Sequence, residues 1–349
     1  MEENKIGILT FHRADNLGAV LQAFALQNTL KDKYLKQVEI IDYRCDAVER
    51  TRGVRKEQGL KGFIKNFLKS GYYAIKRRGF DRFRAENLEI SHKVYTRKNI
   101  KESLDFYDCF IAGSDQIWNL ECSSYDLTYF LDFVTACKRK FSYAASIGNY
   151  KFTEMEEKLI ADHIKNLSGI SVREESAKET LLDMGVGNVS VLPDPVFLLK
   201  EEEWKSVMKK RLYEGKYVLV YLIQEDVNVL KCAEEYARKN GFKLINNKKS
   251  LEFILHNSPD EFLSWVYYSE CVFTNSFHGT AFSLIFGKDL GADIELKNGG
   301  INSRVYELLK KSDAEECIIN KGVSVPFKPK AEEYIEEMRN LAFEFLEKI

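Results

Sequence analysis

Short apolar runs alternate with helical patterns through the first half of the chain. Residues 5–11 form an apolar run, residues 16–33 have the spacing of a helix, and residues 38–43 form the next apolar run. This β-α-β order predicts a parallel sheet. Further runs, each short, apolar and bounded by turn residues, predict buried strands at 107–113, 140–146, 169–174 and 189–195.

A second series of the same kind follows Pro193, Asp194 and Pro195, which predicts a domain boundary shortly after them. Strands are predicted at 217–223, 242–246 and 271–276, with helices at 227–240, ended by Gly241, and from near His278. The pattern predicts an α/β protein with two Rossmann-like domains, residues 1–199 and 200–325. A helix at 326–349 is expected to pack back on the first domain.

Length and composition agree with this picture. The chain has 349 residues, too many for one comfortable hydrophobic core, with 45% hydrophobic and 30% charged residues and a net charge of −1. This balance excludes disorder and bulk nucleic-acid binding. The seven cysteines include no CxxC pair, and no apolar run is long enough for a signal peptide or a membrane span, which predicts a cytoplasmic protein.

A basic segment interrupts the first domain. Residues 44–101 carry 17 Lys and Arg against 6 Asp and Glu, a local charge of +11. From Leu60 the apolar residues follow helical spacing with Lys and Arg opposite, which predicts an inserted basic amphipathic helix. Two interpretations remain open: a surface helix packed on the core, or peripheral contact of residues 60–84 with anionic lipid headgroups.

Polar residues follow the first predicted strand, where the first helix begins. They include Asp15, Asn16, Gly18 and Gln22. Backbone N–H groups at a helix start can hold an anion or a polyol, while Asp15 and Asn16 can equally serve as helix caps. The GxGxxG fingerprint of dinucleotide binding is absent, and Asp42 at the end of the second strand is only a weak ribose-binding candidate.

Two further strands of the first domain end in polar residues. Ser114, Asp115 and Gln116 lie at the carboxyl edge of the predicted sheet, where open α/β sheets bind ligands; a capped turn is the alternative. Arg173 stands just beyond another buried strand. An unpaired cation is costly there, so Arg173 needs either a ligand or a salt bridge to a neighbouring glutamate.

The segment TNSFHGT of the second domain carries the strongest pattern. Asn275 and Ser276 can cap a helix, Gly279 lets a ligand approach the backbone, and His278 lies in the first helical turn. A histidine there can bind an anion when protonated or exchange a proton near neutral pH. Arg304, at another helix start, supplies a further cation. The alternative is a structural histidine with satisfied partners.

Several other chemistries have no support in the sequence. HExxH, Walker A and GxSxG motifs are absent, as are histidine pairs at helical spacing. Zinc hydrolysis, P-loop ATP hydrolysis and serine hydrolase chemistry are therefore not expected, and neither is a metal or a cofactor.

Six segments occur in an order that is specific to one family. They are ILTFHRADNLGAVLQAFALQ, FIAGSDQIWN, YAASIG, ISVRE, LPDPVFLL and TNSFHGTAFSLIFGK, spread over residues 8–288. On these segments the chain resembles the polysaccharide pyruvyl transferases. The resemblance implies a GT-B-like fold, with two Rossmann-like domains facing across a cleft. It also implies transfer of pyruvate from phosphoenolpyruvate onto two hydroxyls of one sugar, which forms a cyclic ketal.

The resemblance implies partners as well. The acceptor is a sugar of a capsular, exopolysaccharide or cell-wall glycan precursor, commonly lipid-linked, so the protein is expected in the cytoplasm or peripherally at the inner face of the membrane. Some family members carry an arginine where this chain has Ser276. That departure makes Arg173 and Arg304 more important for holding the donor.

Roles for individual residues follow. His278 is expected to be the general acid or the protonated partner of the phosphate, and Asp115 or Asp15 the base. The donor is assigned to Arg173, Asn275, Ser276, Gly279 and Arg304, and the acceptor to Asp15, Asn16, Gly18, Gln22, Ser114 and Gln116. Two alternatives remain: a GT-B glycosyltransferase whose nucleotide sugar contacts Asp293 and Glu295, and a catalytically silent sugar-binding member of a glycan assembly complex.

Overall fold

The structure, a computed structural model, describes residues 5–52, 60–295, 302–319 and 326–349, without the side chains of residues 51 and 60–69. It divides into two compact units. The first unit comprises Met1–Lys56, Arg84–Leu198 and Arg339–Ile349, and the second comprises Glu57–Phe83 and Leu199–Met338. Within the described residues, no helix combines the length and the apolar character needed to span a membrane.

A parallel sheet forms the centre of the first unit. Its strands are β1 (Lys5–Leu9), β2 (Gln37–Tyr43), β3 (Ile90–Tyr95), β4 (Cys109–Ala112) and β5 (Arg139–Ser142), in the order β3-β2-β1-β4-β5. Bridges from Phe141 to Gly169 and from Ala145 to Val172 continue it into the pair β6 (Ile170–Val172) and β7 (Val189–Val191). Because the strands are parallel, the turns that follow β1, β4, β5 and β6 lie along one edge of the sheet.

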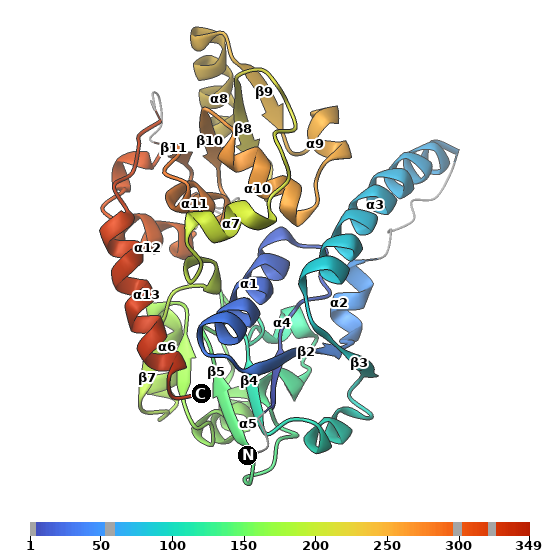
Figure 1. The fold of residues 1–349 in the computed structure, drawn as a ribbon, viewed down its shortest axis with the longest axis vertical. Helices are drawn as coiled ribbons and strands as arrows, with labels where there is room; N and C mark the ends of the chain where they lie inside the picture. The colour runs from blue at the N-terminus through green and yellow to red at the C-terminus, as the bar shows by residue number, and fades with distance from the viewer. Residues whose placement is uncertain (1–4, 53–59, 296–301, 320–325) are drawn as a thin grey trace. The chain divides into compact units, whose positions relative to one another are not determined.

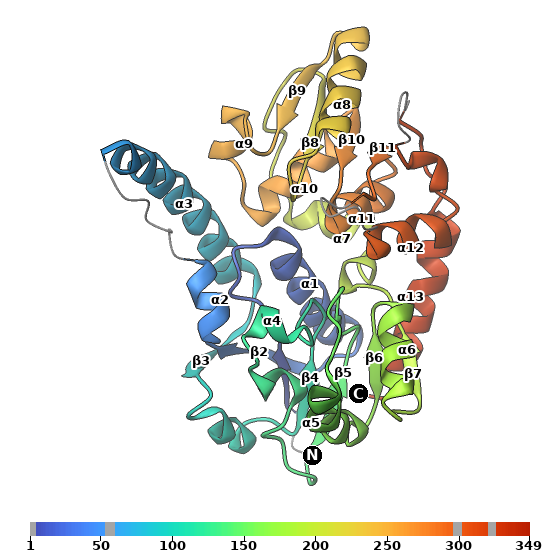
Figure 2. The same cartoon turned by 180° about the vertical axis from the view of Figure 1, so that it is seen from behind.

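Helices cover both faces of this sheet. Helix α1 (Leu17–Asn28) packs on one face, and the segment with α4 (Leu120–Ser123) and α5 (Glu154–Lys165) lies on the other (Figures 1 and 2). Helix α1 is buried along nearly its whole length, as expected of a helix without a polar face. The other elements are α2 (Asp46–Thr51), α6 (Glu175–Asp183), 3-10 turns at Ile100–Asp105, Leu127–Phe130 and Pro195–Phe197, and a π turn at Thr29–Lys33.

The edge strand β3 is not predicted by the hydrophobic pattern. It pairs with β2 through Asp42 and Val94, and Ser91 and Tyr95 are its only buried residues. It therefore lacks the continuous apolar run of a central strand. The basic segment predicted as a helical insertion at 44–101 thus contains α2, α3 (Leu60–Asn87) and this strand. The predicted apolar stripe of α3 falls mainly on residues 60–68, outside the described side chains.

The second unit contains a four-stranded parallel sheet in the order β11-β10-β8-β9. Its strands are β8 (Tyr217–Tyr221), β9 (Lys243–Asn246), β10 (Cys271–Thr274) and β11 (Asp289–Ala292). Helix α8 (Val227–Asn240) packs on one face, and α10 (Pro259–Tyr267) and α11 (Phe277–Ile285) lie on the other (Figure 2). Gly241 ends α8 with a φ of 69°, a left-handed cap that favours glycine. The remaining elements are α7 (Glu201–Val207), α9 (Leu251–Leu255), α12 (Ser303–Lys311) and a 3-10 turn at Glu315–Cys317.

The C-terminal helix α13 (Glu332–Leu346) ends in the first unit. The Arg339 Nε donates a hydrogen bond to the carbonyl oxygen of Phe197 at 3.0 Å. The ring of Phe345 packs edge-on against Phe141 and Tyr143, at centroid distances of 6.5 and 6.3 Å. These contacts hold the last turns of the helix on the first unit.

Candidate functional site

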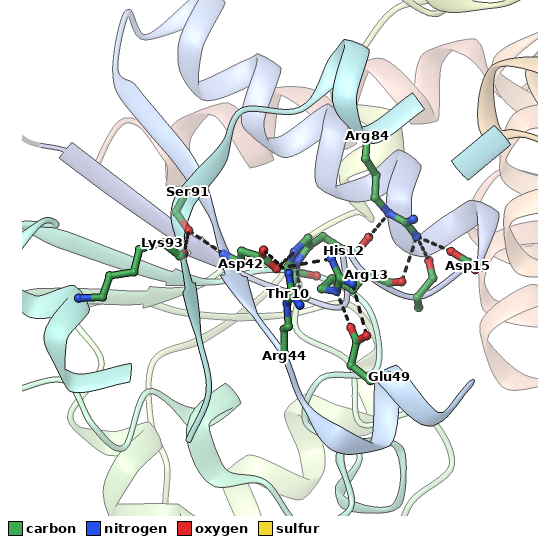
Figure 3. Close-up of polar contacts among 11 residues, drawn as sticks. Thr10, His12, Arg13, Asp15, Asp42, Arg44, Glu49, Arg84, Ser91 and Lys93 are labelled. Atoms are coloured by element: carbon green, nitrogen blue, oxygen red, sulfur yellow. Dashed lines mark hydrogen bonds and ion pairs between the residues drawn. The ribbon is translucent and has the colours of Figure 1, made fainter. Parts of the chain in front are cut away.

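The turn after β1 forms the first part of the candidate site (Figure 3). Asn16 is the N-cap of α1, and its Oδ1 accepts a hydrogen bond from the Ala19 N–H at 3.2 Å. Asp15, the other predicted cap, instead accepts a hydrogen bond from Arg84 at 2.8 Å and lies 3.7 Å from the Nε of Arg52. The structure thus separates two residues that the sequence leaves equivalent: Asn16 caps the helix, and Asp15 is an ion-pair partner.

A buried histidine–aspartate pair lies beside this turn (Figure 3). The His12 Nδ1 is 3.2 Å from the carbonyl oxygen of Thr10, and its Nε2 is 3.6 Å from the Oδ1 of Asp42. Burial lowers the pKa of His12, although Asp42 opposes this effect. Burial acts to raise the pKa of Asp42, but His12, Arg13 and Arg44 outweigh it and lower that pKa. The pair was not predicted from the sequence, whose only signal was that His12 follows β1 and Asp42 lies at the end of β2, a strand expected to be its neighbour.

A buried chain of hydrogen bonds connects β1, α1 and β4. The Gln22 Nε2 donates to the Thr10 Oγ1 at 2.8 Å, and that hydroxyl donates to the carbonyl oxygen of Ser114 at 3.0 Å. The Ser114 Oγ lies 3.5 Å from the Oδ2 of Asp194. Gln22, Ser114 and Gly18 are all buried. Of these predicted acceptor residues, Gln22 and Ser114 therefore support the turns without presenting side chains to solvent, and Gly18 is buried in the first turn of α1.

Asp115 lies at a strained turn after β4. Its φ of 77° is in the left-handed region, which residues other than glycine rarely adopt. Its Oδ1 accepts a hydrogen bond from the N–H of Gln116 at 2.8 Å, and both side chains are partly exposed. Backbone strain of this kind concentrates at functional sites. Because their side chains are partly exposed, Asp115 and Gln116 are the candidates for substrate contact at this turn.

Arg173, after β6, is held by two buried carboxylates. Its Nη1 donates to the Oδ2 of Asp194 at 2.5 Å and its Nε to the Oε1 of Glu174 at 3.2 Å. The same Glu174 oxygen accepts a hydrogen bond from the Ser146 Oγ at 2.5 Å. Burial acts to lower the pKa of Arg173, but the charges of Glu174, Asp194 and Asp115 outweigh it and raise that pKa. Of the two interpretations of Arg173, these contacts fit the salt bridge.

The turn between β10 and α11 forms the candidate site of the second unit. Ser276 is the N-cap of α11 and accepts a hydrogen bond from the Gly279 N–H at 3.3 Å, while its own N–H donates to the Thr274 Oγ1 at 3.0 Å. His278 is the second residue of the helix, partly exposed, and its ring packs edge-on against Phe277 with the centroids 5.2 Å apart. The N–H groups of a first helical turn point out of the helix, so His278 stands where an anion is stabilised.

Asn275 holds the neighbouring turn between β8 and α8. Its Oδ1 accepts a hydrogen bond from the Ile223 N–H at 2.9 Å, and its Nδ2 donates to the carbonyl oxygen of Gln224 at 3.1 Å. The side chain is buried. The hydrogen bonds of this side chain, which was predicted to bind the donor, are therefore internal to the second unit.

Gly279 lies where α11 approaches β10. A Cβ at this position would stand 2.4 Å from the Thr274 Oγ1 and 3.2 Å from the Cδ1 of Tyr221. Thr274 is not free to turn away, because its Oγ1 donates to the carbonyl oxygen of Tyr221 at 2.6 Å and accepts from the Ser276 N–H. Close packing within the unit is thus a sufficient reason for a glycine at this position. The prediction was that Gly279 lets a ligand approach the backbone.

Gly279→Ala is expected to lower the free energy of unfolding by about 1–2 kcal/mol. The steric cost of about 1–3 kcal/mol outweighs the gain of up to about 1 kcal/mol that alanine brings to a helix. Gly71→Ala is the matched control, since Gly71 lies in α3 with no heavy atom within 4 Å of its Cβ position. Urea denaturation of both variants measures the difference, and equal effects would remove the packing explanation.

Asp293, after β11, has a perturbed carboxyl group. Its Oδ1 accepts a hydrogen bond from the Glu295 N–H at 2.7 Å, and its own N–H donates to the carbonyl oxygen of Thr274 at 2.9 Å. Burial and the neighbouring carboxylate of Asp226, the N-cap of α8, raise the pKa of Asp293 to about 6, although the Glu295 N–H opposes them. Burial and a neighbouring carboxylate thus both favour the protonated form of Asp293.

Asp293→Asn is expected to change how stability depends on pH. A carboxyl group whose pKa is raised in the folded protein from 3.8 to about 6 favours the fold while it is protonated, and this contribution is lost as the pH rises through that window. The variant should match the wild type near pH 4 and be more stable by about 1–3 kcal/mol above pH 6, because a neutral amide avoids the cost of the buried carboxylate. Urea denaturation at several pH values measures this, with Glu234→Gln, an exposed change on α8, as the control. Parallel pH profiles for Asp293→Asn and wild type would contradict the assignment.

The predicted site residues fall into two groups according to the exposure of their side chains. The exposed or partly exposed side chains are those of Asp15, Asn16, Asp115 and Gln116 in the first unit and of His278 and Arg304 in the second. The side chains of Gln22, Ser114, Arg173, Asn275 and Ser276 are buried. The first group thus keeps some side-chain surface open to solvent, and the second group shapes the turns. In the described part of the chain, no group of three or more His, Cys, Asp or Glu side chains is placed to hold a metal ion.

Comparison with known protein families gives a match over most of the chain. The sequence model of the family described as polysaccharide pyruvyl transferase matches residues 16–289. This span runs from the cap of α1 through the turn that carries His278, and Asp15 and Arg304 lie outside it. No curated protein is similar enough in sequence to count as a match.

Comparison with solved structures gives similarities at low sequence identity. The complex of MnaA from S. aureus with UDP aligns with a TM-score of 0.50 and 11% identity, covering 98% of this chain and 87% of that chain. A putative UDP-N-acetylglucosamine 2-epimerase from Listeria monocytogenes has a TM-score of 0.49 and 12% identity, with 99% and 89% covered. The UDP-GlcNAc 2-epimerase from Neisseria meningitidis bound to UDP-GlcNAc has a TM-score of 0.48 and 12% identity, with 99% and 100% covered. The S. aureus likeness concerns the fold alone and confirms the predicted GT-B-like class.

Proposed function

Because the chain belongs to the polysaccharide pyruvyl transferase family, we propose that it transfers pyruvate from phosphoenolpyruvate onto a sugar of a glycan precursor, forming a cyclic ketal. The family match supports pyruvyl transfer to a polysaccharide in general. The observation that carries the finer proposal is His278, which is partly exposed in the first turn of α11. A protonatable group at a helix start suits a small donor with two anionic groups.

The second unit supplies the groups that we assign to the donor. Phosphoenolpyruvate carries a phosphate and a carboxylate, so its site needs cations and N–H donors. Arg304 is a partly exposed cation in the first turn of α12, and His278 is a partly exposed imidazole in the first turn of α11. Arg173 is already neutralised by two buried carboxylates. We therefore assign the donor to His278 and Arg304 and give Arg173 a structural role.

The proposed reaction requires one proton donor and one proton acceptor. Protonation of the methylene carbon of phosphoenolpyruvate makes C2 electrophilic, and a first sugar hydroxyl adds to C2 as a base takes its proton. The second hydroxyl then displaces phosphate from C2. Two C–O bonds form, one C–O bond breaks, and the phosphate leaves with the second hydroxyl proton, so the scheme balances without a cofactor.

We assign one residue to each of the two proton transfers. His278 is the proton donor, and Asp115 is the base that accepts the proton from the first sugar hydroxyl. Asp115 suits this role because it is partly exposed at the sheet edge and its carboxylate is held by the hydrogen bond from the Gln116 N–H. Asn16 and Gln116, exposed and partly exposed on the same edge, are assigned to hydrogen bonds with the sugar.

The direct test is pyruvyl transfer by the purified protein. Incubation with phosphoenolpyruvate and a panel of lipid-linked sugars should release phosphate and yield a ketal detectable by mass spectrometry. The S. aureus neighbour was solved with UDP, so nucleotide sugars are the competing donors. Calorimetric titration should show binding of phosphoenolpyruvate and none of UDP sugars. The reverse result would establish a glycosyltransferase, and sugar binding without any transfer would establish a silent binding protein.

A further inference from the structure

The side chain of Arg84, near the end of α3, binds four consecutive residues of the turn after β1 (Figure 3). It is 5% exposed. Its Nε donates to the carbonyl oxygen of His12 at 2.8 Å, and its Nη2 donates to those of Arg13 and Ala14 at 3.0 and 2.8 Å. The same Nη2 lies 2.8 Å from the Oδ1 of Asp15. One guanidinium group thus holds the whole segment from His12 to Asp15, called here the β1–α1 turn.

The chemistry of this contact requires arginine. Three consecutive carbonyl oxygens converge on one cation, and a buried carbonyl without a donor costs about 1–3 kcal/mol. The guanidinium group is planar and has five N–H donors in fixed directions, so one side chain can serve several oxygens. A lysine ammonium group supplies the charge but has three donors on a single nitrogen, and it does not span the same set of oxygens.

Other charged residues hold the same turn from α2 and β2. The Arg13 Nη2 donates to Glu49 at 3.3 Å, and its Nη1 lies 3.7 Å from Asp42. The second carboxylate oxygen of Asp15 lies 3.7 Å from Arg52, the C-cap of α2. The turn is therefore fixed by side chains of three elements, and Arg84 contacts every one of its residues.

We propose that Arg84 is a positioning residue for the sugar acceptor. It fixes the β1–α1 turn so that Asp15 and the adjacent helix cap Asn16 present their polar groups at the carboxyl edge of the sheet. This inference rests on the proposed function, which assigns the acceptor to that edge. It also gives the inserted helix α3 a role in the reaction, because its last turns supply the residue that organises the acceptor side.

Arg84→Lys and Arg84→Ala test the proposal in the full-length protein. Hydrogen exchange of the amides of residues 12–16 should become faster in both variants. The KM for the sugar should rise about tenfold or more, because the turn is then in its binding-competent conformation in only a fraction of the molecules. The kcat and the KM for phosphoenolpyruvate should change less than about threefold. Millimolar guanidinium should restore part of the loss in Arg84→Ala and none in Arg84→Lys, whose side chain occupies the space.

The matched control is Arg78→Ala, an exposed arginine of the same helix, which should change none of these quantities. Unchanged exchange at residues 12–16 in both Arg84 variants overturns the positioning role, whatever the activity. Faster exchange with an unchanged KM for the sugar overturns the link to the acceptor, as does an equal rise in both KM values without rescue by guanidinium. If the wild-type protein transfers pyruvate to no sugar, the proposed function and the acceptor role fail together, and the exchange data still decide whether Arg84 holds the turn.

Discussion

Replacement of His278 by alanine is expected to slow pyruvyl transfer by about a hundredfold to ten-thousandfold, the usual contribution of general acid–base catalysis. Alanine can neither protonate phosphoenolpyruvate nor bind its phosphate as an imidazolium group. The fold should survive, because His278 is partly exposed and the cap Ser276 remains in place. The melting temperature should therefore shift by no more than a few degrees, about 1 kcal/mol or less. Phosphate release at saturating phosphoenolpyruvate measures the rate.

Two further variants sharpen this prediction. His92→Ala removes an exposed histidine of β3 and should leave both rate and stability unchanged. His278→Gln retains a hydrogen-bond donor but cannot be protonated. If the glutamine variant keeps most of the activity, the histidine binds phosphate through a neutral hydrogen bond and does not transfer a proton. Full activity of His278→Ala would reject the assignment altogether.

Arg173→Met is expected to lower the free energy of unfolding by about 3–5 kcal/mol, the usual effect of removing one partner from a buried ion pair. The side chains of Arg173 and Glu174 are 3% exposed and that of Asp194 is 0% exposed. Methionine fills the space but leaves two carboxylates buried without their cation. Urea denaturation measures the loss, and an unchanged slope would show that the folded and unfolded states are otherwise comparable.

The controls for this variant separate a structural role from donor binding. Arg78→Met, an exposed change on α3, should stay within about 0.5 kcal/mol of the wild type. Adding Glu174→Gln and Asp194→Asn to Arg173→Met should recover part of the stability, because the unpaired charges are then gone. If Arg173→Met keeps the stability of the wild type while its KM for phosphoenolpyruvate rises, the result would show that Arg173 binds the donor.

The sequence predicted best those strands and helices whose own residues form an apolar run, a helical period or a cap. Most buried strands are short apolar runs, although β11 was not predicted, and α8 shows a helical period that ends at Gly241, whose φ of 69° matches the expected cap. Strand β3 was not predictable in this way, since only Ser91 and Tyr95 of its residues face the interior. An edge strand is stabilised by pairing with its neighbour, which leaves little pattern in its own residues.

The candidate site was predictable at the level of its turns and less so at the level of side chains. The motif around His278 does form a helix start with Ser276 as its cap, as expected from a polar cluster between a strand and a helix. Gly279 and Asn275 were assigned to the ligand because they belong to the same motif. In the structure, Gly279 packs closely against Thr274, and the Asn275 side chain forms hydrogen bonds within the second unit. Local spacing shows that a polar residue stands at a turn, but the direction of its side chain depends on what packs against it.

By itself, the sequence determined the order of most buried strands and of the main helices, the two Rossmann-like halves, the family, and the place of His278 in the first turn of a helix. These properties depend on residues close together in the chain, where periodicity and capping act. Only the tertiary structure decided that Asp15 pairs with Arg84, 69 residues away, and that Arg173 is neutralised by Asp194. Such pairs depend on distance in space, and a buried charge takes whichever partner the fold brings within reach.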